Sequence, residues 1–229
     1  MLVTQWQYAF VMHELPEPNP SRFKDGPYSR LVNIAGREIL MQPNNPVEQV
    51  SWNDAQEFIK RVNIWSKDDN PLIYQIMPNH ERYAHIRLPT EAEWEYLVRN
   101  RGLWKGPYPD GITQDNLHEY GWYRNTNGFT HPVAELRAFI IEGHPFYDLL
   151  GNVSEWVEDS YHKQYGLTDE QLKQLTKDPV SRSSQGLHCV IRGGGWYNGA
   201  RNLRSAARAY GGPDGRYSDV GFRLVEGKP

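Results

Sequence analysis

The thiol and imidazole side chains are the groups in this sequence that could carry nucleophilic or metal chemistry. The chain has one cysteine, Cys189, and eight histidines. A single thiol excludes an internal disulfide and a multi-thiolate metal centre. The histidines follow no metal-ligand spacing such as HxH or HExxH. His188 and Cys189 are adjacent, so in a strand they point to opposite faces and cannot form a catalytic dyad.

A second stretch of chemical interest is GGGWYNGARNLRSAARAYGGPDGRYSDVGFR, residues 193–223. Five arginines recur in it among small residues and tyrosines. The segment 192–223 contains no Lys, Glu, Gln or Met, although about five would be expected from their frequency in the chain. Guanidinium groups can bind anions, or they can tie carboxylates and backbone carbonyls together. The pattern therefore predicts either an anion site or a fixed frame that carries interchangeable surface residues.

Length and charge limit the class of protein. A chain of 229 residues forms one large domain or two small ones. The net charge of −3 and the pI near 6.2 argue against a nucleic-acid partner. The sequence contains no run of 18 apolar residues that could span a membrane. Its first residues do not resemble a signal peptide. The compartment and the oligomeric state stay open.

Two helices are predicted from capping and periodicity. In SWNDAQEFIKRVNIW, Ser51 and Asp54 form a capping-box variant, and an apolar stripe follows at helical spacing. In LPTEAEWEYLVRN, Thr90 and Glu93 form a capping box. A shorter helix is expected over residues 4–12. The alternating Glu91, Glu93 and Glu95 are interpreted as capping and solvated residues.

The remaining pattern predicts short strands and long irregular segments. Residues 105–127 and 160–185 are predicted to be long connections, the second with a surface helix near 169–177. No repeat or clean linker is visible, so we predict a single α+β domain over residues 1–229. The predicted strands are 82–87, 153–158, Cys189–Arg192 and 220–225.

Four motifs occur in a characteristic order: NPVEQVSWNDAQEFIKRVN, RLPTEAEWEYLVR, YDLLGNVSEWVEDSY and VIRGGGWYNGARNLRSAAR…GFRLV. In this order and spacing the chain resembles the formylglycine-generating-enzyme (sulfatase-modifying factor) family from about residue 3 to residue 225. The resemblance implies a C-type lectin-like fold with two main helices, short antiparallel strands and long loops. The family's usual opening strand has no counterpart before VTQWQYAFVM, so this strand is either trimmed or replaced.

The resemblance does not extend to the family's catalytic cysteines. Catalytic members oxidise a substrate cysteine at copper that two cysteines hold, because a soft thiolate pair selects Cu(I). In the corresponding segment 196–208, Asn198 and a position near Leu203 take their places. We therefore expect no copper and no catalytic residue. The alternative is a formylglycine-generating-enzyme-like oxidoreductase or cofactor-maturation enzyme that works without the cysteine pair.

Domains of this branch also serve as variable proteins of diversity-generating retroelements, which replace template adenines, mainly in AAC codons. Changes in the first two bases of AAC cannot yield Lys, Glu, Gln, Trp or Met. This fits residues 192–223, in which the sole tryptophan, Trp196, is assigned to the framework. Turns that need small residues at positive φ would leave a similar composition. We predict a non-catalytic protein that displays a variable region at 192–223 to a protein or cell-surface ligand. The predicted ligand-binding residues are Tyr197, Asn198, Gly199, Ala207, Ala209, Tyr210, Gly211, Gly212, Gly215, Tyr217, Ser218 and Asp219.

A variable surface needs a frame that does not depend on it. We expect Arg204, Arg208 and Arg223 to reach carboxylates or carbonyls beneath the loops. The predicted core residues of this frame are Trp156, Trp196, Leu203 and Phe222. A third possibility is an interaction domain of a larger assembly, with the loop fixed in sequence.

The loop YDLLGNVSEW is a candidate cation site. The resemblance implies a structural calcium ion with five ligands, and two carboxylates with three carbonyls suit a hard cation. The alternative is that the two carboxylates bind only backbone amides and arginines. The implied ligands are the side chains of Asp148 and Glu155 and the carbonyls of Leu149, Gly151 and Val153.

Overall fold

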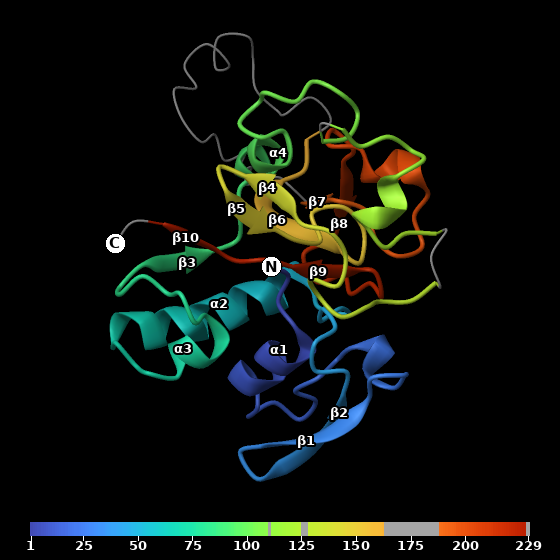
Figure 1. The fold of residues 1–229 in the computed structure, drawn as a ribbon. Helices are drawn as coiled ribbons and strands as arrows, with labels where there is room; N and C mark the ends of the chain where they lie inside the picture. Colours follow the sequence, from blue (N-terminus) through green and yellow to red (C-terminus); the bar gives the residue numbers. More distant parts are fainter. Residues whose placement is uncertain (110, 125–127, 163–187, 228–229) are drawn as a thin grey trace.

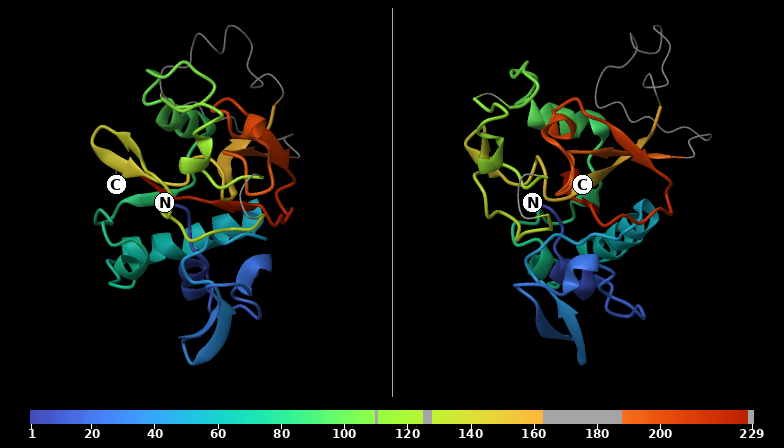
Figure 2. Two further views of the ribbon diagram at one scale, coloured as in Figure 1. Left: turned by 45° about the vertical axis from the view of Figure 1, so that its right-hand side comes forward. Right: turned by 90° about the vertical axis from the view of Figure 1, so that its right-hand side faces the viewer.

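The computed structural model describes residues 1–109, 111–124, 128–162 and 188–227 (Figures 1 and 2). The α-helices are α1 (Gln5–Val11), α2 (Trp52–Lys67), α3 (Ile73–Ile76) and α4 (Glu91–Val98), and the 3₁₀ turns are η1 (Arg22–Lys24), η2 (Leu117–Glu119) and η3 (Ala200–Leu203). The strands are β1 (Arg30–Ile34), β2 (Arg37–Met41), β3 (His85–Arg87), β4 (Phe139–Ile141), β5 (His144–Phe146), β6 (Ser154–Ser160), β7 (Cys189–Arg192), β8 (Ala209–Gly211), β9 (Val220–Phe222) and β10 (Val225–Gly227).

Local sequence determines where the main helices begin. The side chains of Ser51 and Thr90 accept backbone N–H groups from the first turns of α2 and α4, and Asp54 and Glu93 bind back to the cap residues. Both capping boxes are thus confirmed. Thr4 caps α1 in the same way, within the predicted span 4–12.

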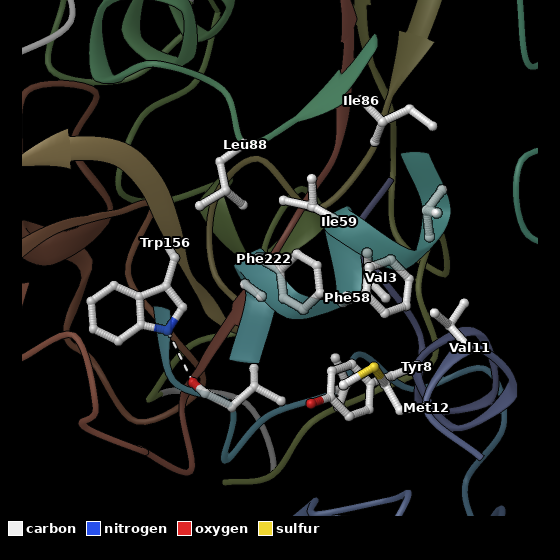
Figure 3. Packing of buried hydrophobic residues seen from close by; sticks show 14 of the residues in the cluster. Val3, Tyr8, Val11, Met12, Phe58, Ile59, Ile86, Leu88, Trp156 and Phe222 are labelled. Atoms are coloured by element: carbon white, nitrogen blue, oxygen red, sulfur yellow. Dashed lines mark hydrogen bonds between the residues drawn. The ribbon is translucent and has the colours of Figure 1, made fainter. Parts of the chain in front are cut away.

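The first core joins α1 and α2 to the strands. Phe58 of α2 packs edge-on against Phe222 of β9, with their ring centroids 5.4 Å apart (Figure 3). Trp156 of β6 is fully buried, and its indole N–H donates to the carbonyl of Val50 (Figure 3). Since a buried indole needs an acceptor, this bond explains how the tryptophan is accommodated in an apolar core.

A four-stranded sheet in the order β8-β7-β6-β9 supports the C-terminal segment. Strands β6 and β7 are antiparallel, as are β7 and β8, but β6 and β9 are parallel. The prediction of antiparallel strands is therefore wrong for this pair. Their residues lie far apart in the chain, and a long connection lets a strand enter a sheet in either direction.

Helix α4 and the loops around it cover the sheet with a second core. Trp94 is almost fully buried there beside Val157 and Val190. The two small antiparallel pairs β1–β2 and β4–β5 complete the described sheets together with β3–β10. In both views of Figure 2 the β1–β2 hairpin lies at the end of the molecule opposite α4.

Several predicted boundaries change. The strand predicted at 82–87 is shortened to β3, and the strand predicted at 220–225 is divided into β9 and β10. The hairpins β1–β2 and β4–β5 and the short helix α3 were not predicted. The surface helix predicted near 169–177 lies outside the described residues. In the part of the chain that is described, no helix has the length and apolar character required to cross a membrane.

Candidate functional site

The predicted variable region surrounds a surface cavity of about 280 Å³ next to β7 and β8. Framework residues Ile191, Arg192 and Arg208 form part of its wall. Segments far apart in the region are thus brought to one place. The predicted ligand-binding residues that line the cavity are Tyr197, Asn198, Ala207, Ala209, Tyr210, Tyr217 and Asp219.

The other five predicted residues lie elsewhere. Gly199 lines a neighbouring hollow that it shares with Tyr197 and Asn198. Gly212, Gly215 and Ser218 are half-buried.

Gly211 does not fit the prediction of an interchangeable surface position. It is buried in β8, and an added Cβ would come within 2.8 Å of both the Trp156 ring and the Tyr217 ring. Since Trp156 is fully buried, we assign Gly211 to the frame.

Backbone conformation distinguishes two kinds of glycine in the region. Gly193 and Gly194 have φ values of 90° and 71°, which favour glycine. The later glycines of the region have no positive φ. An added Cβ at Gly199 or Gly212 would meet no atom within 4 Å. The explanation that turns require small residues is therefore wrong at these two positions.

The backbone of residues 217–219 is held by groups from the frame. The carbonyl of Tyr217 accepts the N–H of Gln49 at 2.9 Å, and that of Asp219 accepts the N–H of Ser154 at 2.7 Å. Between them, the carbonyl of Ser218 accepts the indole N–H of Trp196 at 2.9 Å. None of these bonds uses a side chain of the loop itself, so the loop path does not depend on which side chains it carries.

Asn198 combines a surface position with a turn function. Its side-chain oxygen accepts the N–H of Gly195 at 2.8 Å, and its carbonyl accepts the N–H of Arg124 at 2.9 Å. A replacement at this position would keep the second bond and lose the first.

Arg208 confirms the expectation of a guanidinium frame. It donates two bonds to the carboxylate of Glu91, at 2.6 and 2.7 Å, and a third to the carbonyl of His162. Glu91 is only 3% exposed, so the interpretation of this residue as solvated is wrong. Bidentate pairing of this kind orients the arginine as well as neutralising it.

Arg192 performs the role that the sequence assigned to Arg204. Its buried guanidinium donates to the carbonyls of Ser205 and Ala207 and to the carboxylate of Glu95. Arg204 is exposed, and among the described residues it donates only to the carbonyl of Arg201 in its own turn, so that prediction is wrong. The sequence feature that could have identified Arg192 as a frame residue is its position at the end of the apolar strand CVIR.

The predicted core residues of the frame are mostly confirmed. Trp156, Leu203 and Phe222 are fully buried. Trp196 is half-buried and lines the hollow beside Gly199, so the prediction that it is a core residue is wrong.

Arg223, predicted to be a frame residue, pairs with Glu155 in the interior. Its guanidinium donates to both oxygens of Glu155 and to the carbonyl of Asp148, and both side chains of the pair are almost fully buried. The carboxylate of Asp148 accepts the N–H of Ala134 and the amide of Asn152, and burial raises its pKa.

As placed, the two carboxylates expected to bind calcium already have partners within the chain. Arg223 neutralises Glu155 and takes the carbonyl of Asp148, so a cation there would face a guanidinium. Structural calcium stays a prediction that this arrangement does not favour.

Removal of calcium should leave the fold unchanged. Because Arg223 already neutralises Glu155, we expect EDTA to shift the Tm by less than about 1 °C, corresponding to a few tenths of a kcal/mol. Thermal unfolding with EDTA, and again after addition of excess calcium, measures the effect. A rise of several degrees on adding calcium would contradict the prediction.

Asp219 is a carboxylate in the cavity wall that is 8% exposed. Burial raises its pKa to about 6. Among the described residues, no cationic side chain forms an ion pair with it. The charge of Asp219 is therefore a cost to the fold at neutral pH.

The pH dependence of stability tests this assignment. A folded pKa above the unfolded value stabilises the fold below about pH 4, and this stabilisation is lost as the pH rises through about 6. Asp219→Asn should raise the free energy of unfolding by about 1–3 kcal/mol at pH 7.5 and leave it unchanged at pH 4. Urea unfolding of both proteins at both pH values measures the difference. Nearby Glu48, whose pKa burial raises to about 7, also titrates in this range, and the charge of Asp219 contributes to that raised pKa. Equal effects at the two pH values would exclude the titration of Asp219 as the cause.

The single thiol is placed for packing. Cys189 is buried in β7, and burial raises its pKa to about 11. Since the thiolate is the reactive form, this thiol is protonated and inert near neutral pH. The neighbouring His188 is exposed, with its ring against Tyr210.

The sheet order, the two main helices and the long loops define a C-type lectin-like fold of the formylglycine-generating-enzyme type. The model of the sulfatase-modifying factor enzyme 1-like domain matches residues 2–228, and the chain belongs to this family.

Known proteins similar to this chain include enzymes and a variable protein. A formylglycine-generating enzyme of Thermomonospora curvata is 29% identical over 213 residues, covering 87% of this chain and 61% of that protein. A Bos taurus protein named inactive C-alpha-formylglycine-generating enzyme 2 is 27% identical, covering 80% and 50%. The solved structure of Treponema denticola variable protein 1 has a TM-score of 0.71 and 27% identity, covering 100% and 82%. The chain thus spans less than two thirds of the length of the Thermomonospora curvata and Bos taurus proteins.

Proposed function

We propose that this chain is a non-catalytic ligand-binding protein that displays residues 192–223 as a diversified surface, as a variable protein of a diversity-generating retroelement. The observation that carries the proposal is the separation of frame from surface. Backbone carbonyls of residues 217–219 are bound by Gln49, Trp196 and Ser154, while Gly199 and Gly212 have open space beside them. The structural likeness to Treponema denticola variable protein 1 supports it.

The chemistry of the surface also suits binding. Tyr197, Tyr210 and Tyr217 are 50%, 54% and 39% exposed, and all three line the cavity. Tyrosine offers a large amphipathic contact area at low entropic cost, and small polar residues adapt around it. A protein or cell-surface ligand is the partner that such a surface fits.

An oxidoreductase or cofactor-maturation activity is the second candidate, because several relatives are named formylglycine-generating enzymes. The segment 196–208 carries no cysteine, and Cys189 is buried with a raised pKa. Copper titration combined with turnover of a cysteine-containing peptide tests this candidate. Copper-dependent oxidation of the peptide would favour the enzyme over the binding protein.

The genomic neighbourhood tests the diversified surface directly. We expect a reverse-transcriptase gene near this gene and a near-copy of the segment encoding residues 192–223. The copy should carry AAC codons at the exposed positions and framework codons at Gly193, Gly194 and Gly211. Absence of both the reverse transcriptase and the copy would remove the retroelement function and leave a binding protein of fixed sequence.

Two adjacent glycines provide a matched test of frame and surface. Gly212→Ala should change the free energy of unfolding by less than about 0.5 kcal/mol, because the new methyl group meets open space. Gly211→Ala should lower it by about 1–3 kcal/mol, because the methyl group overpacks Trp156 and Tyr217. Urea unfolding of both variants measures the contrast. Similar losses would mean that the two positions are not distinguished as the geometry indicates.

A further inference from the structure

The cavity in the variable region combines features that select one kind of chemical group. It joins Asp219, a carboxylate that is 8% exposed, to three exposed tyrosines, one from β8 and two from loops. We propose that this cavity binds an alkylammonium group, as carried by a lysine side chain of the ligand. The inference rests on the proposed function, because it names the ligand chemistry of the same surface.

Charge balance around the cavity leaves Asp219 as its uncompensated group. Two arginines also line the cavity, but Arg208 is held by both oxygens of Glu91 and Arg192 by Glu95. Both arginines are thus held by carboxylates of the frame, although Arg99 also pairs with Glu95. In the part of the chain that is described, no cation is paired with Asp219, so this carboxylate is available to a cation of the ligand.

The backbone of Asp219 is held by the frame. Its carbonyl accepts the N–H of Ser154, and an added Cβ at Gly195 would come within 3.0 Å of its Cβ. The carboxylate raises the pKa of Tyr197, which shows that the two side chains are close. A buried acceptor is thereby held ready for a donor from outside the chain.

The tyrosines add a second attraction for a cation. Tyr197, Tyr210 and Tyr217 line the same cavity, and an aromatic ring attracts an ammonium group by about 0.5–2 kcal/mol when the ammonium lies over its face. A volume of about 280 Å³ lies just below the range of drug-sized ligands, so one side chain is the occupant that fits.

An ammonium group inserted here gains both the ion pair with Asp219 and the contacts with the rings. An anion would instead meet an unpaired carboxylate, and an apolar side chain would leave that carboxylate desolvated without a partner. The cavity therefore discriminates by charge, because the neutral and anionic competitors each bury Asp219 at a cost.

The experiment titrates the ¹⁵N-labelled full chain at pH 7.5 with Nα-acetyl-lysine methylamide and follows amide chemical shifts around residues 195–219. The norleucine and glutamate analogues of this amide are the neutral and anionic controls. We expect saturable shifts with the lysine probe and binding at least about tenfold weaker with either control.

Two variants locate the contact. Asp219→Asn should weaken binding of the lysine probe at least about tenfold. Asp214→Asn, which alters an exposed carboxylate of the same segment that does not line the cavity, should leave the Kd within about twofold. Asp219→Asn is expected to be more stable than the parent at this pH, so lost binding would not reflect unfolding.

Several outcomes would overturn the inference: equal binding of the norleucine probe, preferential binding of the glutamate probe, or unchanged binding by Asp219→Asn.

A last comparison uses n-butylammonium chloride. Tighter binding of the lysine amide than of the free amine supports a polypeptide ligand, and equal binding supports a small amine. The genomic test of diversification does not depend on these titrations, so failure of one proposal is distinguishable from failure of the other.

Discussion

Arg223→Met is expected to lower the free energy of unfolding by about 3–5 kcal/mol, the loss typical of removing one partner from a buried ion pair. The change leaves the carboxylate of Glu155 buried without its guanidinium, and it leaves the carbonyl of Asp148 without its donor. Urea unfolding at pH 7.5 measures the loss.

A control arginine and a double variant separate this effect from a general loss of charge. Arg216→Met removes an exposed pair with Asp54 and should cost less than about 1 kcal/mol. Arg223→Met combined with Glu155→Leu should recover part of the loss, because no unpaired charge is then left in the core. A loss from Arg223→Met no larger than that from Arg216→Met would contradict the buried pair.

Arg192→Met should have a similar effect, about 3 kcal/mol or more, because its guanidinium side chain is fully buried and holds three acceptors. It should also loosen residues 205–207, whose carbonyls it binds. Urea unfolding gives the global loss, and amide hydrogen exchange of Ala207 reports the local one.

Arg204→Met is the matched control, because it removes an exposed arginine of the same segment. We expect its effect on the free energy of unfolding to be within about 0.5 kcal/mol. If Arg204→Met proved as damaging as Arg192→Met, the frame would include the residue that the sequence pattern first suggested.

Features determined by near neighbours could be predicted from the sequence. The capping residues Ser51 and Thr90 act within three positions of themselves, so the starts of α2 and α4 were correct. The resemblance to a family of known fold supplied the sheet architecture that local patterns could not. Even so, the parallel pairing of β6 with β9 was missed, because strand direction depends on a distant connection.

In the candidate site, the burial of individual residues could not be predicted from the sequence. Gly199 and Gly211 look alike in the sequence, yet only the second lies against a buried ring. Likewise, Glu91 was interpreted as solvated, although its partner Arg208 lies 117 positions later. Burial and long-range pairing decide both cases, and neither is encoded in spacing along the chain.

The carbonyl bonds that hold residues 217–219 have a further consequence for association rates. A loop whose path is already determined before the partner arrives needs no rearrangement in the encounter complex, so its ordering entropy is lost during folding and not during binding. Each new set of side chains on this backbone would then begin from the same rigid starting point. Such variants would therefore differ mainly in the dissociation rates of their complexes.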